Sequence, residues 1–378
     1  MAVATLAFPD YATARAAAGF GWSAAGAQGA MRQLSGVPIQ EFNLNPTACA
    51  AAYRIGRPRL REMFGPEVAI PGICTPAVSY GHANCLGSSL SFPEGGEVAH
   101  DHPYGSLTEA RAAVTRPVDF ASAGCAPFYL DFREQLRAAF PGEPVGFGFG
   151  MEGPITSAYE LRGEGFFTDI YDQPAEAVAF LAELTDSIVD YRRWTASLDG
   201  QTLPSPSGTG MCDDLSSFIP AARWPELVLP AWERYYRGCT TGPRSVHVED
   251  LRAAQLPHLE AAGINRYDPS ISGKLNPRII AQSCRVPFVW RLGAFHYRSM
   301  TLTDVADFVY QAAADGASGV ITVIEEIMCN ESTAAKVRAF VAAAKEAKAL
   351  LSAGASRAEL GERVTPANRA RYWDDWWR

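Results

Sequence analysis

Short apolar segments with strand character alternate along most of this chain with longer helical segments rich in Ala, Leu and Glu. Parallel strands need long crossover connections, usually helices, so this alternation predicts a parallel sheet. The strand-like segments lie at 37–43, 67–73, 145–151, 207–213, 244–249, 264–268, 286–292 and 319–325, and the clearest helical segments at 174–198, 224–237, 251–262, 302–315 and 332–352. Eight such units without a large break in composition predict an α/β fold with one closed (β/α)8 TIM barrel, and a doubly wound open sheet is the alternative.

The rest of the chain divides around this barrel. We expect an N-terminal arm at 1–36, the barrel at 37–353 and a C-terminal tail at 354–378. A long insert at 75–140, after the second strand, is expected to be a loop excursion with a helix. Pro174 favours a helix start near Gln173, and Ser332 or Thr333 is the expected cap of the last long helix.

Charge and cysteine usage restrict the kind of partner. The chain has 378 residues, with 33 Lys and Arg against 41 Asp and Glu, so its formal net charge is −8. That balance argues against a nucleic-acid partner. Eight cysteines without a CxxC pair are typical of reduced thiols in the cytoplasm. We find neither a basic leader nor an apolar stretch of about 20 residues, and therefore expect no membrane association. The arm and the Trp-rich tail favour a homodimer.

Ionisable side chains follow several of the predicted strands. Glu152 follows the third strand, Asp213 and Asp214 the fourth, and Arg291 ends the seventh. Catalytic groups of (β/α)8 enzymes lie at these carboxyl ends, so the four residues are candidates for catalysis. An arginine at the barrel mouth suits a substrate carboxylate or phosphate, whereas Asp214 could equally cap the next helix.

His247 and Glu249 form the sharpest candidate metal site. Residues i and i+2 of a strand point to the same face, so both can reach one ion. Cys329 and Glu326, with Glu325 as an alternative, follow the eighth strand across the barrel mouth. A thiolate, an imidazole and a carboxylate suit zinc, whereas carboxylates in place of the thiolate favour iron or manganese. The alternative is that His247 and Glu249 form a local ion pair and cap the following helix.

Gly148, Gly150 and Gly153 match the spacing of a dinucleotide-binding loop. They lie inside a predicted strand rather than after one, so we reject a nicotinamide cofactor.

Several ordered motifs resemble the uroporphyrinogen decarboxylase superfamily. They are Gly153-Pro-Ile-Thr156, Leu161-Arg-Gly163, Tyr171-Asp-Gln-Pro174, Cys212-Asp-Asp214, Trp224-Pro-Glu-Leu-Val-Leu-Pro230, His247, Leu256-Pro-His-Leu-Glu-Ala-Ala-Gly-Ile264, Asn265-Arg-Tyr-Asp268 and the last long helix, Ala334 to Ala347. The resemblance covers roughly residues 37–350 and implies a (β/α)8 barrel. Decarboxylases of the superfamily carry an Arg-rich motif near the first strand and an Asp at the second, which segments 37–43 and 69–74 lack.

The other branch of the superfamily contains zinc-dependent methyltransferases, which move a methyl group between a corrinoid protein or another donor and a thiol. Their zinc ligands are a His-x-Cys pair at the fifth strand and a Cys after the eighth. His247 matches the histidine, Glu249 stands in place of the first cysteine, and Cys329 or Glu326 lies near the second. The resemblance therefore implies a metal-dependent methyltransferase, with any corrinoid held by a separate protein.

Two alternatives stay open. One is a metal-free decarboxylase or lyase, in which Arg291 holds a small carboxylate substrate and Asp213 or Asp214 handles protons. The other is a non-catalytic partner of a corrinoid protein.

Overall fold

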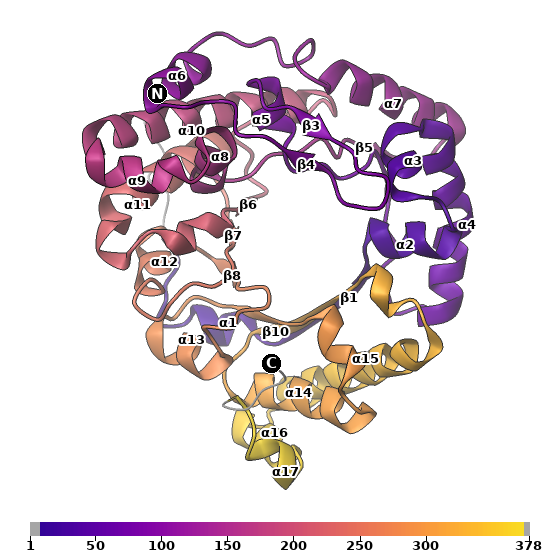
Figure 1. The fold of residues 1–378 in the computed structure, drawn as a ribbon. Helices are drawn as coiled ribbons and strands as arrows, with labels where there is room; N and C mark the ends of the chain where they lie inside the picture. Colours follow the sequence, from indigo (N-terminus) through magenta and orange to yellow (C-terminus); the bar gives the residue numbers. More distant parts are fainter. Residues whose placement is uncertain (1–7, 374–378) are drawn as a thin grey trace.

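The computed structural model describes residues 8–373, in which eight strands form a ring around a central axis and helices surround them (Figure 1). The ring strands are β1 (Gly21–Gly26), β2 (Ile73–Cys74), β5 (Val145–Gly146), β6 (Thr209–Cys212), β7 (Arg244–His247), β8 (Arg266–Asp268), β9 (Val289–Leu292) and β10 (Gly319–Ile324). This mixed α/β architecture confirms the predicted class.

Neighbouring ring strands are parallel, but their hydrogen-bonded ladder is interrupted. The ladders are β1-β10-β9, β2-β5 and β6-β7-β8. Single parallel bridges link β8 to β9 at Tyr267 and Phe288, and β1 to the segment before β2 at Ala25 and Ala69. Beyond the end of β5, the amide of Gly153 donates to the carbonyl of Cys212 at 2.5 Å. The strands β5 and β6 therefore meet without forming a ladder.

The first ring strand is not where the sequence pattern placed it. Residues 37–43 were expected as a strand, yet Ile39–Leu44 forms helix α3 after Pro38. The strand is instead β1, inside the expected arm, paired along its length with β10. The arm boundary at 36 is therefore wrong. A short apolar segment such as 37–43 is compatible with both the helical and the strand periodicity of apolar residues. The sequence of β1, Gly-Trp-Ser-Ala-Ala-Gly, lacks the β-branched residues that are typical of strands.

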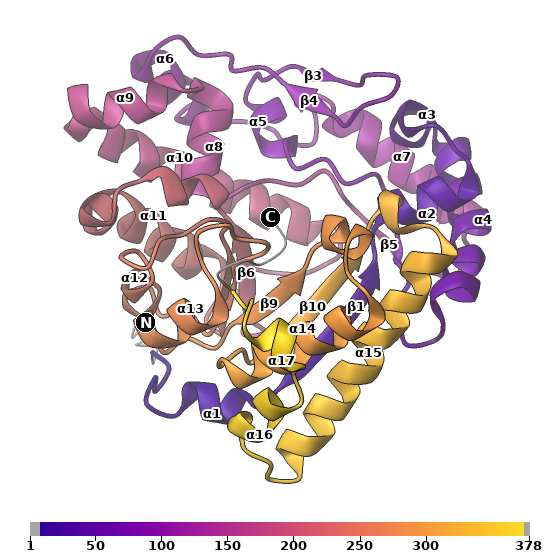
Figure 2. The same cartoon turned by 60° about the horizontal axis from the view of Figure 1, so that its bottom comes forward.

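Helices surround the ring. They are α1 (Ala14–Ala18), α2 (Gln28–Ser35), α3, α4 (Pro46–Phe64), α5 (Gly81–Cys85), α6 (Leu107–Val114), α7 (Ala126–Ala139), α8 (Pro154–Arg162), α9 (Gly165–Asp172), α10 (Pro174–Ser197), α11 (Trp224–Cys239), α12 (Pro257–Ala261), α13 (Pro277–Ser283), α14 (Leu302–Ala314), α15 (Glu331–Ser352), α16 (Arg357–Glu362) and α17 (Pro366–Arg369). The short 3-10 helices η1 (Asp214–Phe218), η2 (Ala221–Arg223), η3 (Ala294–Arg298) and η4 (Glu326–Met328) follow ring strands or precede α11. Figure 2 shows β9, β10 and β1 side by side, with α15 along their outside. None of the helices within residues 8–373 combines the length and apolarity needed to cross a bilayer.

The long helices match their predictions closely, but in the segment predicted as a helix at 251–262 only Pro257–Ala261 forms one. The α10 helix begins at Pro174 after Gln173, as expected. The cap of α15 differs, because the side chain of Asn330 accepts from the amide of Thr333. Asn is as good a cap as Ser, and its position just before Glu331 decides the start. The insert contains α5, the hairpin β3 (Leu90–Ser91) and β4 (Ala99–His100), α6 and α7.

The inner face of β6, β7 and β8 carries small and polar side chains. Met211, Val246 and Tyr267 are buried, and successive strand residues point to opposite faces. The alternate positions therefore face the ring interior, in two cross-strand rows, Gly210–Ser245–Arg266 and Cys212–His247–Asp268. Bulky branched residues fill this space in a typical barrel. Here the rows leave a cavity.

Candidate functional site

The second inner row forms the centre of the candidate site. Register pairs Cys212 with His247 and His247 with Asp268 at the carboxyl ends of β6, β7 and β8. The imidazole Nδ1 of His247 lies 3.0 Å from Oδ2 of Asp268. This contact fixes the ring orientation and leaves Nε2 facing the mouth of the ring.

Two further carboxylates face that free nitrogen. The Nε2 atom of His247 lies 3.7 Å from Oδ1 of Asp214 and 3.8 Å from Oε1 of Glu249. The amide of Glu249 donates to the same Asp214 oxygen at 2.8 Å, which ties the two loops together. The structure thus brings His247 and Glu249 together, and adds Asp214 and Asp268.

The acidic surroundings change the proton affinity of His247. Burial lowers its pKa, but hydrogen bonds to Asp268 and Glu249 and the charges of Asp268 and Asp214 outweigh that effect and raise the pKa to about 10. With these side chains alone, His247 is an imidazolium at neutral pH.

Glu152, which follows β5, is a further carboxyl group whose pKa is influenced by Asp214 and Asp213. Burial, which exceeds the opposing effect of a hydrogen bond to Ser79, raises the pKa of Glu152 to about 7. The charges of Asp214 and Asp213 act in the same direction. A carboxyl group with this pKa exchanges protons readily near neutral pH, as a general acid or base must.

Asp213, the other carboxylate after β6, has a structural position. Its side chain is fully buried; Oδ1 accepts from the amides of Ile155 and Thr156, and Oδ2 accepts from Nε1 of Trp232. The two amides belong to the first turn of α8. Both oxygens of Asp213 are therefore engaged, whereas neighbouring Asp214 faces His247.

Arg291 lies at the edge of the same group. Its Nη1 donates to Oγ of Ser270 at 3.0 Å, and its Nη2 lies 4.0 Å from Oδ2 of Asp268. The Nε atom is buried without a hydrogen-bond partner in the described residues. The charge of Arg291 also lowers the pKa of Glu249, after the larger effect of the His247 hydrogen bond.

Cys329 and Glu326 have other contacts. The Sγ of Cys329 lies 3.6 Å from the carbonyl of Ala30 and 3.8 Å from that of Glu325. Glu326 forms an ion pair with Arg32 on α2. Burial raises the pKa of the Cys329 thiol to about 11. These contacts place both residues against α2, and none of them involves His247.

The position of Arg32 changes the sequence comparison with the decarboxylases, which had found no arginine near the first strand. The segment used for the missing arginine motif, 37–43, is not the first strand. Arg32 lies on the helix that follows β1, and besides Glu326 it contacts the carbonyl of Val37. The first strand is therefore followed by at least one arginine, which is already paired.

Within residues 8–373, no group of three or more His, Cys, Asp or Glu side chains is placed so that it could hold a metal ion. Donor atoms that share one ion through bonds of about 2.1 Å lie roughly 3.4 Å apart. The distances of 3.7 and 3.8 Å from His247 are a few tenths of an ångström longer. The two oxygens are therefore near the ligand spacing from His247 without reaching it, and Asp268 holds the second imidazole nitrogen as in many metal centres.

Asp268 and Ser270 were not among the predicted site residues. The signal for Asp268 was its position at the carboxyl end of the sixth strand. Ser270 has a positive φ of 51° and is fully buried, features that the sequence does not reveal.

Comparison with known proteins supports the fold. No family model matches the chain, and no curated protein sequence does. Among solved structures, a methyltransferase from Methanosarcina mazei aligns with a TM-score of 0.63 and 17% identity, over 88% of this chain and 96% of that chain. At this identity the likeness shows a shared fold and nothing about the site.

Proposed function

We propose that this chain is a methyltransferase of the uroporphyrinogen decarboxylase superfamily with a closed (β/α)8 barrel. The ordered motifs from Gly153 to Asp268 support the superfamily. The fold shared with a methyltransferase along most of both chains supports the branch. The methyl donor would be a corrinoid on a separate protein or another methyl compound, and the acceptor a thiol.

The proposed metal dependence rests on the arrangement of side chains around His247. Its Nδ1 is held by Asp268 at 3.0 Å, while Nε2 faces oxygens of Asp214 and Glu249 at 3.7 and 3.8 Å. A histidine held by a carboxylate on one nitrogen and exposed to further ligands on the other is typical of metal centres. In our proposal Asp214 is the third metal ligand. It replaces Cys329 and Glu326, which the sequence analysis named as ligands but which contact α2.

A divalent metal here, with zinc first and iron or manganese as alternatives, would lower the pKa of a thiol acceptor enough to form the thiolate. The residues of the chain bind and orient it. Asp268 fixes the imidazole of His247, and Asp214 is fixed by the amide of Glu249. Glu152, with a pKa of about 7, would take up the proton that the thiol releases.

The test is elemental analysis of protein purified without added metal. We expect about one metal ion per chain in the wild type, and loss of metal and of thiol methylation together in His247→Ala and Glu249→Ala. Cys329→Ser is the control and keeps both. Full methyl transfer by metal-free protein contradicts the proposal.

A second candidate is a metal-free decarboxylase or lyase. It is favoured by the pKa of about 10 for His247 and of about 7 for Glu152, which make a general acid and a general base in one site. Arg291 would hold the substrate carboxylate in competition with Asp268. Activity that survives a strong chelator but is lost in Arg291→Gln supports this candidate over the first.

A further inference from the structure

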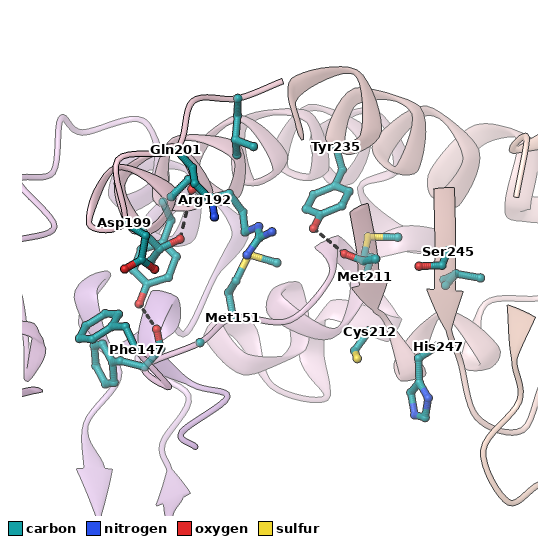
Figure 3. A pocket seen from close by; sticks show the side chains of 18 of the residues that line it. Phe147, Met151, Arg192, Asp199, Gln201, Met211, Cys212, Tyr235, Ser245 and His247 are labelled. Carbon is teal, nitrogen blue, oxygen red and sulfur yellow. Dashed lines mark hydrogen bonds between the residues drawn. The ribbon is translucent and has the colours of Figure 1, made fainter. Parts of the chain in front are cut away.

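A cavity of about 600 Å³ opens in the wall of the ring between β5 and β6 (Figure 3). At one end it reaches Cys212, His247 and Asp268, and at the other Arg192 and Asp199 at the end of α10 and beyond it. The volume lies within the usual range for small-molecule sites. The cavity therefore joins the candidate site to the flank of the molecule.

The cavity can open between β5 and β6 because these two strands do not pair in a ladder. The inward positions nearest to it, Gly210 and Ser245, have small side chains that leave the ring interior open. The walls on the outer side are provided by α10 and α11, through Thr195, Ala196 and Tyr235. The hydroxyl of Tyr235 donates to the carbonyl of Gly210 at 2.9 Å, which ties α11 to β6 beside the cavity.

Two arginines line this cavity without a carboxylate partner. Within residues 8–373, neither Arg192 nor Arg266 forms an ion pair, and Nε of Arg192 is buried without a hydrogen-bond partner. Both carboxylates of the lining have cationic partners: Asp199 pairs with Arg133, and Asp268 pairs with His247, which also lines the cavity. Arg192 is half-buried and Arg266 is exposed, so both guanidinium groups are open to an anionic ligand.

Figure 3 shows the guanidinium of Arg192 extending between Met151 and Tyr235, towards the middle of the cavity. Arg192 also lies near the thiol of Cys239, where it partly opposes the rise in that thiol's pKa caused by burial. A thiol is a weak acceptor, so the donors of Arg192 keep capacity for an oxyanion.

The rest of the lining mixes polar and apolar side chains. Phe147, Met151, Leu203 and Met211 supply much of its apolar part, and Met151 and Met211 lie between Arg192 and His247 in Figure 3. Phe147 packs edge-on against Trp194, with ring centroids 5.7 Å apart, which holds that wall in place. A lining in which apolar side chains stand beside a cation suits a molecule with an apolar body and one anionic end.

We propose that this cavity, which we call the flank chamber, binds an organic carboxylate, with the carboxylate at Arg192 and the apolar body between Met151 and Met211. Arg266, on the inner face of β8, adds a second positive charge. The ligand's distal end would point towards His247. Binding in the flank chamber does not depend on methyl transfer.

The test is calorimetric titration of the full-length protein with octanoate, and with 1-octanol as the uncharged analogue. We expect octanoate to bind wild-type protein at least tenfold more tightly than 1-octanol. Arg192→Gln should weaken octanoate binding about tenfold or more, since hydrogen bonds to charged groups are the stronger class. Arg192→Lys should retain most of the affinity.

Arg193→Gln is the matched control, because Arg193 is the next residue of α10, is exposed and pairs with Asp190 at 2.7 Å. Should Arg192→Gln fail to fold, Ala196→Leu, which fills part of the chamber, provides an independent variant and should weaken both ligands. No octanoate binding by the wild type, or equal affinities in Arg192→Gln and Arg193→Gln, overturns the proposal. If octanoate binding were lost in His247→Ala but not in Arg192→Gln, the carboxylate would bind beside His247 instead of at Arg192.

Discussion

Asp268 holds His247 from the next strand of the ring, with 3.0 Å between Oδ2 and Nδ1, because the parallel register sets the two residues side by side. The contact is thus built into the pairing of β7 with β8 rather than into a mobile loop. It decides which imidazole nitrogen faces Asp214 and Glu249, and so which one is available for chemistry.

Replacing Asp268 by Asn tests this relationship. The variant keeps the shape but removes a negative charge, so the pKa of His247 should fall from about 10. An NMR titration of the imidazole signals measures that fall. We expect catalytic turnover or metal affinity to decrease by roughly 10- to 100-fold. An unchanged pKa would show that Asp214 and Glu249, not Asp268, control the histidine.

Asp213 and Asp214 are adjacent but should behave differently. Asp213→Ala leaves the amides of Ile155 and Thr156 and the indole of Trp232 without their acceptor, which we expect to cost about 3 kcal/mol or more of unfolding free energy. Asp214→Ala should change stability far less and instead reduce activity or metal content. Urea denaturation and activity assays on both variants check the contrast, and equal destabilisation would contradict it.

Glu152 should make stability depend on pH. Its pKa is raised from 4.5 to about 7, so the folded state binds the proton more tightly than the unfolded state. Unfolding free energy should therefore fall as pH rises from about 4.5 to 7, then level off. Glu152→Gln removes this penalty and should stabilise the protein by up to about 3 kcal/mol at pH 8.

Below pH 4 the same substitution should have little effect, because both states are then protonated. Thermal denaturation of wild type and variant across this pH range measures the difference. A constant difference at every pH would mean that Glu152 has an ordinary pKa in the folded protein.

Cys329→Ser should leave metal content and activity close to those of the wild type. The thiol contacts the carbonyls of Ala30 and Glu325, and burial raises its pKa to about 11, so it is not poised as a thiolate. Elemental analysis of the variant decides this point. Loss of bound metal would restore the ligand set that includes Cys329.

The positions of strands and helices could be predicted from the sequence where these elements carry their full apolar pattern. The strand segments from 145 onward and helices such as α10 and α15 lie close to their predicted positions. The first strand was missed because Gly21–Gly26 consists of Gly, Ala, Ser and Trp, whose pairing with β10 comes from tertiary contacts rather than propensity.

Local sequence spacing could predict which site residues meet at one strand end, but not which side chains meet across the ring. His247 and Glu249 are two residues apart, so local geometry alone predicted their contact. Cys329 depends on where the loop after β10 runs, and it runs against α2. The opposite roles of Asp213 and Asp214 depend on a buried tryptophan from α11, which no local pattern indicates.

Because β5 and β6 form no ladder, the side chains that line the flank chamber and those of the candidate site are held in place in different ways. Side chains such as Met151, Ala196 and Leu203 line the flank chamber from loops and a helix, and can be exchanged without breaking any strand pairing. The row of Cys212, His247 and Asp268 is held by ladder register on both sides of His247. Descendants of one ancestral chain could therefore diverge in the molecules they accept while the reacting groups stay in place.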